Sequence, residues 1–288
     1  FMPEFFRQNG YFTGVAGKVF HGGVDRLTEN GPQWDYQSKA RGRMSQRELM
    51  RNHRLKGVGG GTPGRPALHG RKQGNTAVRV FDVEDDAFND HAWAADVAGQ
   101  LEDRASDRKP FFLWAGLFNP HVPYHMPRRY WEMHNPDRKT WPEPPANDLA
   151  DIPVAALNYD PATTRPDTPA MRRNCIAGHD ACVSYLDAQI GMIIDELDRL
   201  DLWQNTIVLF FGDQGVHLGE HGGLYSKNTL FEEATNTPYI MAAPGMPGAR
   251  VCEDVVEFID TFPTLVELCD LPQPAQALSG ASLRPLLQ

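Results

Sequence analysis

The chain has 288 residues, with 37 acidic and 28 basic side chains and a formal net charge of −9. This length suits one large α/β domain or two small ones, and the acidic balance argues against a nucleic-acid-binding protein, which would carry a basic surface. No apolar run approaches the roughly 18 residues of a membrane-spanning helix, and the four cysteines lack the C-x-x-C spacing of a zinc or redox site.

The N-terminal part predicts a short helix and a strand. Residues 2–9 have an amphipathic helical pattern, and residues 11–16 are strand-like. Lys18 and His21 follow this strand; taken alone, they are typical of a surface lysine and a loop histidine. Residues 31–75 are rich in Arg, Gly and Pro and have no periodicity, which predicts a long surface loop.

A second helix and strand are predicted in the next hundred residues. Residues 87–105 have a helical pattern, with Asp90 as the expected N-cap. The apolar run at 110–116 predicts a buried strand, and His121 follows it between two prolines that stiffen its loop. A histidine held at the end of a strand is a candidate acid or base. Residues 126–169 are proline-rich and predict an irregular excursion.

The strongest pattern joins a long helix to a strand. Apolar residues recur at three- and four-residue steps through 171–200. Residues 206–211 are all β-branched, aromatic or apolar, which predicts a strand buried on both faces. A helix that leads into such a strand is half of a crossover unit, and a further strand is expected at 237–243. The sequence therefore predicts an α/β fold with one mixed, mostly parallel sheet flanked by helices.

Two oxygen-bearing side chains, Asp213 and Gln214, follow the strand at 206–211. Ligands in open α/β sheets bind at the carboxyl ends of the strands, and carboxylate and amide oxygens suit a hard cation such as calcium or magnesium. Taken alone, the pair is also typical of a polar turn after a core strand. The glycine-rich loop that follows carries His217 and His221, to which the pattern assigns no role.

Four stretches together resemble the sulfatase branch of the alkaline-phosphatase superfamily, and in particular its iduronate-2-sulfatase-like subgroup. They are MPEFFRQNGYFTGVAGKVFHGG (2–23), FFLWAGLFNPHVPYHMPRRYW (111–131), VSYLDAQIGMIIDELDRLDLWQNTIVLFFGDQGVHLGEHG (183–222) and IDTFPTLVELCDLPQP (259–274). Their shared order is more specific than any one of them. The similarity is weak from about residue 24 to residue 80.

The resemblance implies a metal and an anion site. Asp213 and Gln214 match the metal pair, which in this family holds a calcium ion. Lys18 and His21 match the residues that contact the nucleophile and its anionic intermediate. Such a site would supply the charge neutralisation that cleavage of a sulfate ester needs.

Two further matches concern the substrate. His121 matches the histidine near the leaving-group oxygen, and Lys227 matches the lysine that grips the sulfate. The resemblance thus implies a sulfated glycan or small sulfate ester as the substrate, and it favours a periplasmic, secreted or lysosomal setting. Nothing in the sequence indicates an oligomeric state.

The sequence departs from the family at the nucleophile. Relatives make formylglycine from the Cys or Ser of a C-x-P-S-R-like motif, and the cysteines here lie in NCIAG, ACVSY, VCEDV and LCDLP instead. The resemblance places that motif, and an acidic metal pair, upstream of residue 1. We therefore interpret residues 1–288 as part of a sulfatase catalytic domain, without the N-terminal part and the C-terminal subdomain.

Two other readings of the same residues stay open. A phosphatase or phosphonate monoester hydrolase of this superfamily would use similar lysine, histidine and metal groups on a phosphoryl centre. A non-catalytic homologue would keep the fold and bind anions without turnover. The identity of the nucleophile distinguishes a sulfatase from a phosphoryl-transfer enzyme. A sulfatase needs the C-x-P-S-R-like motif, whereas a phosphoryl-transfer enzyme needs a bare Thr or Ser.

Overall fold

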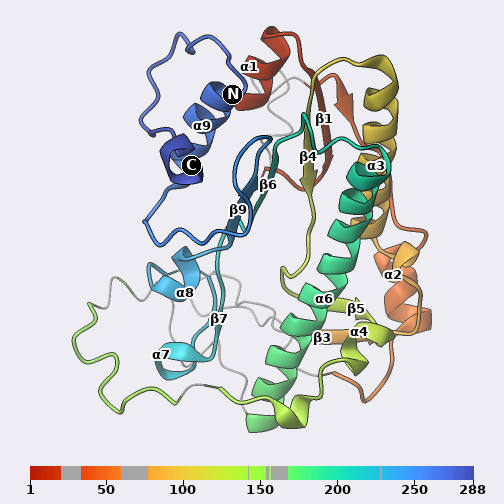
Figure 1. Cartoon of the computed structure of the whole chain (residues 1–288). Coiled ribbons are helices and arrows are strands. Elements are labelled where there is room, and N and C mark those ends of the chain that lie inside the picture. Colours follow the sequence, from red (N-terminus) through yellow and green to blue (C-terminus); the bar gives the residue numbers. More distant parts are fainter. Residues whose placement is uncertain (21–33, 60–76, 142, 154–155, 157–167, 228) are drawn as a thin grey trace.

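The structure is a computed structural model that describes residues 1–20, 34–59, 77–141, 143–153, 156, 168–227 and 229–288 (Figure 1). The described residues form a mixed α/β arrangement in which strands lie beside two long helices. The helix α3 packs against β1, β4 and the longer helix α6, and α1 packs on β1. The predicted α/β class is therefore confirmed.

The strands of the described residues fall into four hydrogen-bonded groups. The largest has the order β2–β1–β4 and is parallel throughout, with β1 and β4 paired along their whole length. The pair β3–β5 is also parallel, whereas β6–β9 and β7–β8 are antiparallel. The bounds are β1 Phe12–Gly17, β2 Tyr36–Gln37, β3 Val78–Phe81, β4 Phe111–Gly116, β5 Tyr124–Pro127, β6 Val208–Phe211, β7 His217–Leu218, β8 Tyr225–Ser226 and β9 Tyr239–Ala242.

The helices match the periodic segments of the sequence. The longest, α6, begins at Pro169, where the Thr168 hydroxyl caps it by accepting from the Met171 amide at 3.2 Å. The α-helices are α1 Met2–Gln8, α2 Gln46–Glu48, α3 Asn89–Asp107, α4 Arg128–Glu132, α6 Pro169–Arg199, α7 Glu220–Gly223, α8 Glu232–Thr235, α9 Thr261–Leu268 and α10 Arg284–Leu287. None of the described helices combines the length and apolar character needed to cross a bilayer.

A cluster of buried hydrophobic residues lies between α6 and the β3–β5 pair, in the lower half of Figure 1. The strands contribute aliphatic and aromatic side chains and the helix contributes small and aromatic ones. Each large apolar side chain buried there contributes about 1.5–3 kcal/mol. Its fully buried members include Val78, Val80, Phe81, Tyr124, Met126, Ala181, Cys182 and Tyr185.

Two predictions for the strand after α6 are wrong in detail. The strand β6 starts at Val208 and is half-buried along its length rather than buried on both faces. Among the described strands its partner is β9, which runs antiparallel. Both β4 and β6 line a cavity of about 1490 Å³ together with the apolar face of α6. Among the described strands, β6 and β9 form a hydrogen-bonded pair of their own that is not joined to β4.

The segments predicted to be irregular contain short elements. Within 31–75 the described part forms β2, α2 and a π-helical turn at Leu49–His53, and residues 60–76 lie outside the described residues. The excursion at 126–169 begins with β5 and α4 and has a 3-10 turn at Pro136–Arg138. All four cysteines are free thiols, of which two are buried.

A partly buried histidine beside an arginine makes the fold sensitive to acid. Arg79 Nη1 lies 2.9 Å from His125 Nε2, and burial, with the charges of Arg79 and Arg54, lowers the pKa of His125 from 6.5 to about 4. Below pH ~6.5 the unfolded chain binds the extra proton first, so stability falls as the pH drops through this window. The loss at full extent is on the order of 3 kcal/mol.

We expect His125→Gln to lose less unfolding free energy than the parent sequence between about pH 7 and pH 4.5, as measured by urea denaturation. The amide side chain does not titrate and can still accept from Arg79. His53→Gln serves as the control and should keep the acid sensitivity of the parent sequence. An unchanged pH dependence in His125→Gln would contradict this account.

Candidate active site

Two strands end side by side where Lys18 leaves the sheet. Gly17 has a φ of +82°, and a Cβ there would lie 2.1 Å from the carbonyl oxygen of Gly116. A Cβ on Gly116 would in turn lie 2.1 Å from the carbonyl oxygen of Lys18. Glycine is therefore required at both positions for the backbones to approach so closely. The approach fixes Lys18 at the carboxyl ends of β1 and β4.

The loop after β4 presents His121. Its Nδ1 lies 2.6 Å from the carbonyl oxygen of Val122. A carbonyl oxygen only accepts, so Nδ1 carries the proton and Nε2 is left for a ligand. The ring of His121 lies against Phe118 at a centroid distance of 4.8 Å, and Lys18 Nζ lies 5.8 Å from the centroid of the same Phe118 ring. Phe118 thus joins the lysine of one strand end to the histidine of the next.

Asp213 and Gln214 follow β6 on a loop that the backbone holds from both sides. The Gly212 amide donates to Pro238 O at 3.1 Å, and the Gly215 amide donates to Ala234 O at 3.0 Å. Both side chains are exposed and line the same large cavity as Lys18 and His121. The carboxylate and the amide are therefore available to a ligand that enters this cavity.

A small hairpin, β7–β8, carries Lys227 to the cavity. His217, the first residue of β7, is fully buried, and its Nε2 lies 2.7 Å from the Thr229 hydroxyl. His221 bridges two carboxylates, with Nδ1 at 3.0 Å from Asp148 and Nε2 at 3.1 Å from Glu233. The two loop histidines, which the sequence left without a role, are thus structural supports of the hairpin.

Five of the six sequence-predicted residues line one cavity: Lys18, His121, Asp213, Gln214 and Lys227. The sixth, His21, lies outside the described residues. Within the described part of the chain, neither Lys18 nor Lys227 forms an ion pair. The cavity therefore combines positive charge with little internal compensation, which favours an anionic ligand.

The charges in the cavity act on one another. Burial lowers the pKa of His121, and the positive charges of Lys227 and Lys18 lower it further, while the Val122 carbonyl and Asp213 oppose them. Burial also lowers the pKa of Lys227; Asp213 raises it and Lys18 lowers it. These mutual effects place the groups within electrostatic reach of each other. An anion in the cavity would relieve the repulsion and raise both pKa values.

Asp213 and Gln214 offer the oxygen donors that a hard cation prefers, but two side chains are too few to fill its coordination shell. Calcium takes about six to eight oxygen ligands, and Asp213 and Gln214 supply two side chains. Across the described ranges, no group of three or more His, Cys, Asp or Glu residues is arranged to hold a metal ion. A cation held here would need oxygen ligands beyond these two side chains.

The sequence did not predict the role of Asp90, a buried carboxylate near the site. Asp90 was expected to cap α3, but it lies inside the first helical turn, behind the N-cap Phe88. Its carboxylate instead accepts from the amides of Phe118 and Asn119. The only local signal was an acidic residue near a helix start, which is typical of a cap, and the true partners are 28 and 29 residues away.

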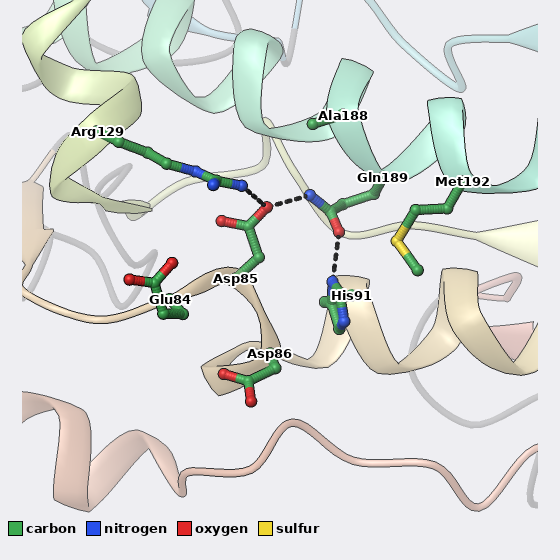
Figure 2. Close-up of a pocket in the computed structure, with 8 residues that line it drawn as sticks. All are labelled: Glu84, Asp85, Asp86, His91, Arg129, Ala188, Gln189 and Met192. Atoms are coloured by element: carbon green, nitrogen blue, oxygen red, sulfur yellow. Dashed lines mark hydrogen bonds and ion pairs between the residues drawn. The ribbon is translucent and has the colours of Figure 1, made fainter. Parts of the chain in front are cut away.

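A second cavity, of about 340 Å³, lies between η3 (Asp85–Ala87), the start of α3 and α6 (Figure 2). One oxygen of Asp85 accepts from Arg129 at 2.5 Å, from the Tyr130 hydroxyl at 2.6 Å and from Gln189 Nε2 at 2.9 Å. Gln189 Oε1 also lies 3.0 Å from His91 Nδ1. These groups bind one another, so the cluster ties α6 to the start of α3.

The chain is similar in sequence to known sulfatases. A family profile described as Sulfatase matches residues 1–271. A sulfatase of Formosa agariphila is 30% identical over 94% of this chain and 52% of its own length. Iduronate 2-sulfatase of Homo sapiens is 28% identical over 95% of this chain and 55% of its own length. The chain spans about half the length of these curated relatives.

Solved structures show the same fold. A phosphonate monoester hydrolase of Silicibacter pomeroyi matches with a TM-score of 0.73 and 20% identity, over 99% of this chain and 60% of its own. A protein solved in complex with its substrate D-glucosamine-2-N,6-O-disulfate matches with a TM-score of 0.62 and 18% identity, over 99% and 64%. The fold and its strand-end cavity define an α/β protein of the alkaline-phosphatase superfamily. Within that class, the chain belongs to the sulfatase family.

We expect Lys227→Met to raise the pKa of His121, because the substitution removes a positive charge that disfavours the imidazolium ion. The pKa is measured by an NMR titration of the histidine ring. Lys56→Met, which removes an exposed lysine from another segment, should leave it unchanged. Equal pKa values in Lys227→Met and the parent sequence would place Lys227 away from His121.

Proposed function

We propose that this chain supplies the anion-binding half of a sulfuric ester hydrolase active site, with a sulfated glycan or a related sulfate ester as the substrate. The observation that supports the proposal is the meeting of Lys18, Lys227 and His121 in one cavity of a sulfatase-family chain. The substrate class is supported by relatives and neighbours whose names specify iduronate sulfate and a disulfated glucosamine.

Each group has a role that its surroundings allow. The ammonium groups of Lys18 and Lys227 bind sulfate oxygens and offset the charge that cleavage develops there. His121 stands near the leaving-group oxygen, with Nδ1–H fixed by the Val122 carbonyl and Nε2 directed to the ligand. Burial and the nearby lysines lower the pKa of His121, which favours the neutral ring, and a bound sulfate ester would raise that pKa. The ring then carries the proton on Nε2 that the leaving oxygen requires.

Three further groups would complete the proposed site: a metal ion, His21 and a nucleophile. Asp213 and Gln214 would contribute two side chains to a calcium site, and the ion would supply charge stabilisation at the sulfate. His21 would contact the nucleophile. The nucleophile would be a formylglycine from a C-x-P-S-R-like motif, which residues 1–288 do not contain.

One alternative has an observation in its favour. Phosphonate monoester hydrolases are among the matching structures, and the lysine and histidine groups of this cavity also suit a phosphoryl centre. A third possibility is a homologue that binds anions without turnover. Hydrolysis of sulfate esters at a rate well above that of matched phosphate and phosphonate esters favours the sulfatase.

We expect the 288-residue chain to hydrolyse no aryl or sugar sulfate above background, because its sequence contains no C-x-P-S-R-like nucleophile motif. A longer form of the protein that includes such a motif, matured to formylglycine, is expected to turn over both. The measurement is sulfate release with calcium added. Clear turnover by the 288-residue chain would show that the nucleophile has been assigned to the wrong place.

In the longer form, Asp213→Ala should lower turnover by about a hundredfold or more, since it removes a charged ligand of the metal. Glu253→Ala is the matched control, because Glu253 is an exposed carboxylate away from the cavity lining. Undiminished activity in Asp213→Ala would overturn the metal assignment.

A further inference from the structure

A single buried carboxylate holds the loop that carries His121. Asp90 is 2% exposed, and its Oδ1 accepts from the Phe118 amide at 2.8 Å. Its Oδ2 accepts from the Asn119 amide at 2.9 Å and from Asn119 Nδ2 at 2.8 Å. All three donors belong to the two residues that separate β4 and Leu117 from the Pro120–His121 turn. The carboxylate therefore fixes the loop just before His121.

The same two residues also organise the cavity. Phe118 lies against the His121 ring and near Lys18 Nζ, and its carbonyl oxygen accepts from the His121 amide at 3.0 Å. A displacement of Phe118 would therefore move the histidine and remove the aromatic face that lies beside Lys18. Through these contacts Asp90 acts on both groups without lining the cavity itself.

The start of α3, which carries Asp90, is held in place by hydrogen bonds from α6 to residues before and after Asp90. Gln189 of α6 is 1% exposed and donates from Nε2 to Asp85, while its Oε1 lies 3.0 Å from His91 Nδ1 (Figure 2). Asp85 and His91 flank Asp90 in the sequence. The long helix thus fixes the start of α3, and the start of α3 fixes the loop after β4.

We propose that Asp90 is a positioning residue that sets the place of His121, and through Phe118 that of Lys18, in the anion cavity. The proposal rests on the proposed function, because it concerns how those two residues meet the sulfate ester. Asp90 touches neither the cavity nor its ligand. Its contribution is geometric, since small displacements of a reacting group cost rate steeply.

The substitution Asp90→Asn tests this with little change of shape. Three N–H donors face the carboxylate, and an amide side chain has one accepting oxygen and one NH₂ group. In either orientation the NH₂ group meets at least one N–H donor from Phe118 or Asn119. The loop must then move, whereas the hydrophobic packing around residue 90 is kept.

The first experiment uses the 288-residue chain. In Asp90→Asn, we expect the ring NMR signals of His121 to shift and the affinity for inorganic sulfate to fall about tenfold. As the control, Asp103→Asn changes an exposed carboxylate on the same helix and should leave both readouts unchanged. Parent-like His121 signals and sulfate affinity in Asp90→Asn would overturn the proposal.

A milder variant covers the case in which Asp90→Asn does not fold. Gln189→Met keeps the volume of the side chain and removes the clamp on Asp85 and His91. It should shift the His121 signals in a well-folded chain, without a change in any residue that lines the anion cavity. A folded Gln189→Met chain with unchanged His121 signals would contradict the proposed chain of contacts.

The second experiment uses a longer form that hydrolyses sulfate esters. There Asp90→Asn should lower kcat/KM for an alkyl or sugar sulfate about a hundredfold. The loss should be about tenfold or less for 4-nitrophenyl sulfate, whose leaving group needs little protonation. Equal losses on both substrates would overturn the positioning of His121. No turnover of any sulfate ester by the unsubstituted longer form would instead refute the proposed function.

Discussion

The site depends on two lysine charges that share one cavity and that Asp213 offsets only in part. Lys18 and Lys227 come from strand ends more than two hundred positions apart, and the charge of each affects His121. Holding like charges together in a half-buried cavity costs free energy. Two features of the fold hold the lysines in place against this repulsion. The backbones approach closely at Gly17 and Gly116, and the hairpin that precedes Lys227 is anchored by the buried His217 and Tyr225. An anion with several oxygens would relieve the repulsion, which supports the proposal of a sulfate ester as the ligand.

The cavity has a second character away from the lysines. It continues between β4 and β6 to the apolar side chains of α6, among them Ile190 and Ile193. Those strands each pair along one edge with another described strand, so the sheet is divided at this point. The polar site lies where the strands end, as in other α/β proteins. The one cavity therefore has two parts: a polar part at the strand ends, where we propose that the substrate binds, and an apolar part between β4 and β6.

Regular patterns in the sequence predicted the elements well. The apolar repeat predicted a helix at 171–200, and α6 spans Pro169–Arg199; the run at 110–116 corresponds to β4. Such patterns work because burial of one helix face or of a strand is dictated by nearby residues. The burial and pairing of 206–211 were not predictable in this way, since they depend on which distant strand lies alongside.

The candidate site shows the same division between local and distant information. The resemblance located Lys18, His121 and Lys227 by motif, and the structure brings them to one cavity. The resemblance did not indicate that Asp90 holds the His121 loop, because a carboxylate near a helix start is usually explained by capping. The structural roles of His217 and His221 were likewise not predictable, because their partners, such as Glu233 beside His221, are brought near only by the fold.

The central claim is that Lys18, Lys227 and His121 together bind one sulfate group. The most direct measurement is a crystal structure of the chain grown with inorganic sulfate. The account predicts a sulfate ion in the large cavity, with its oxygens within hydrogen-bond distance of both lysine Nζ atoms and of His121 Nε2. A cavity without sulfate, in crystals that hold the ion on other basic residues such as Arg54 and Arg79, would contradict it.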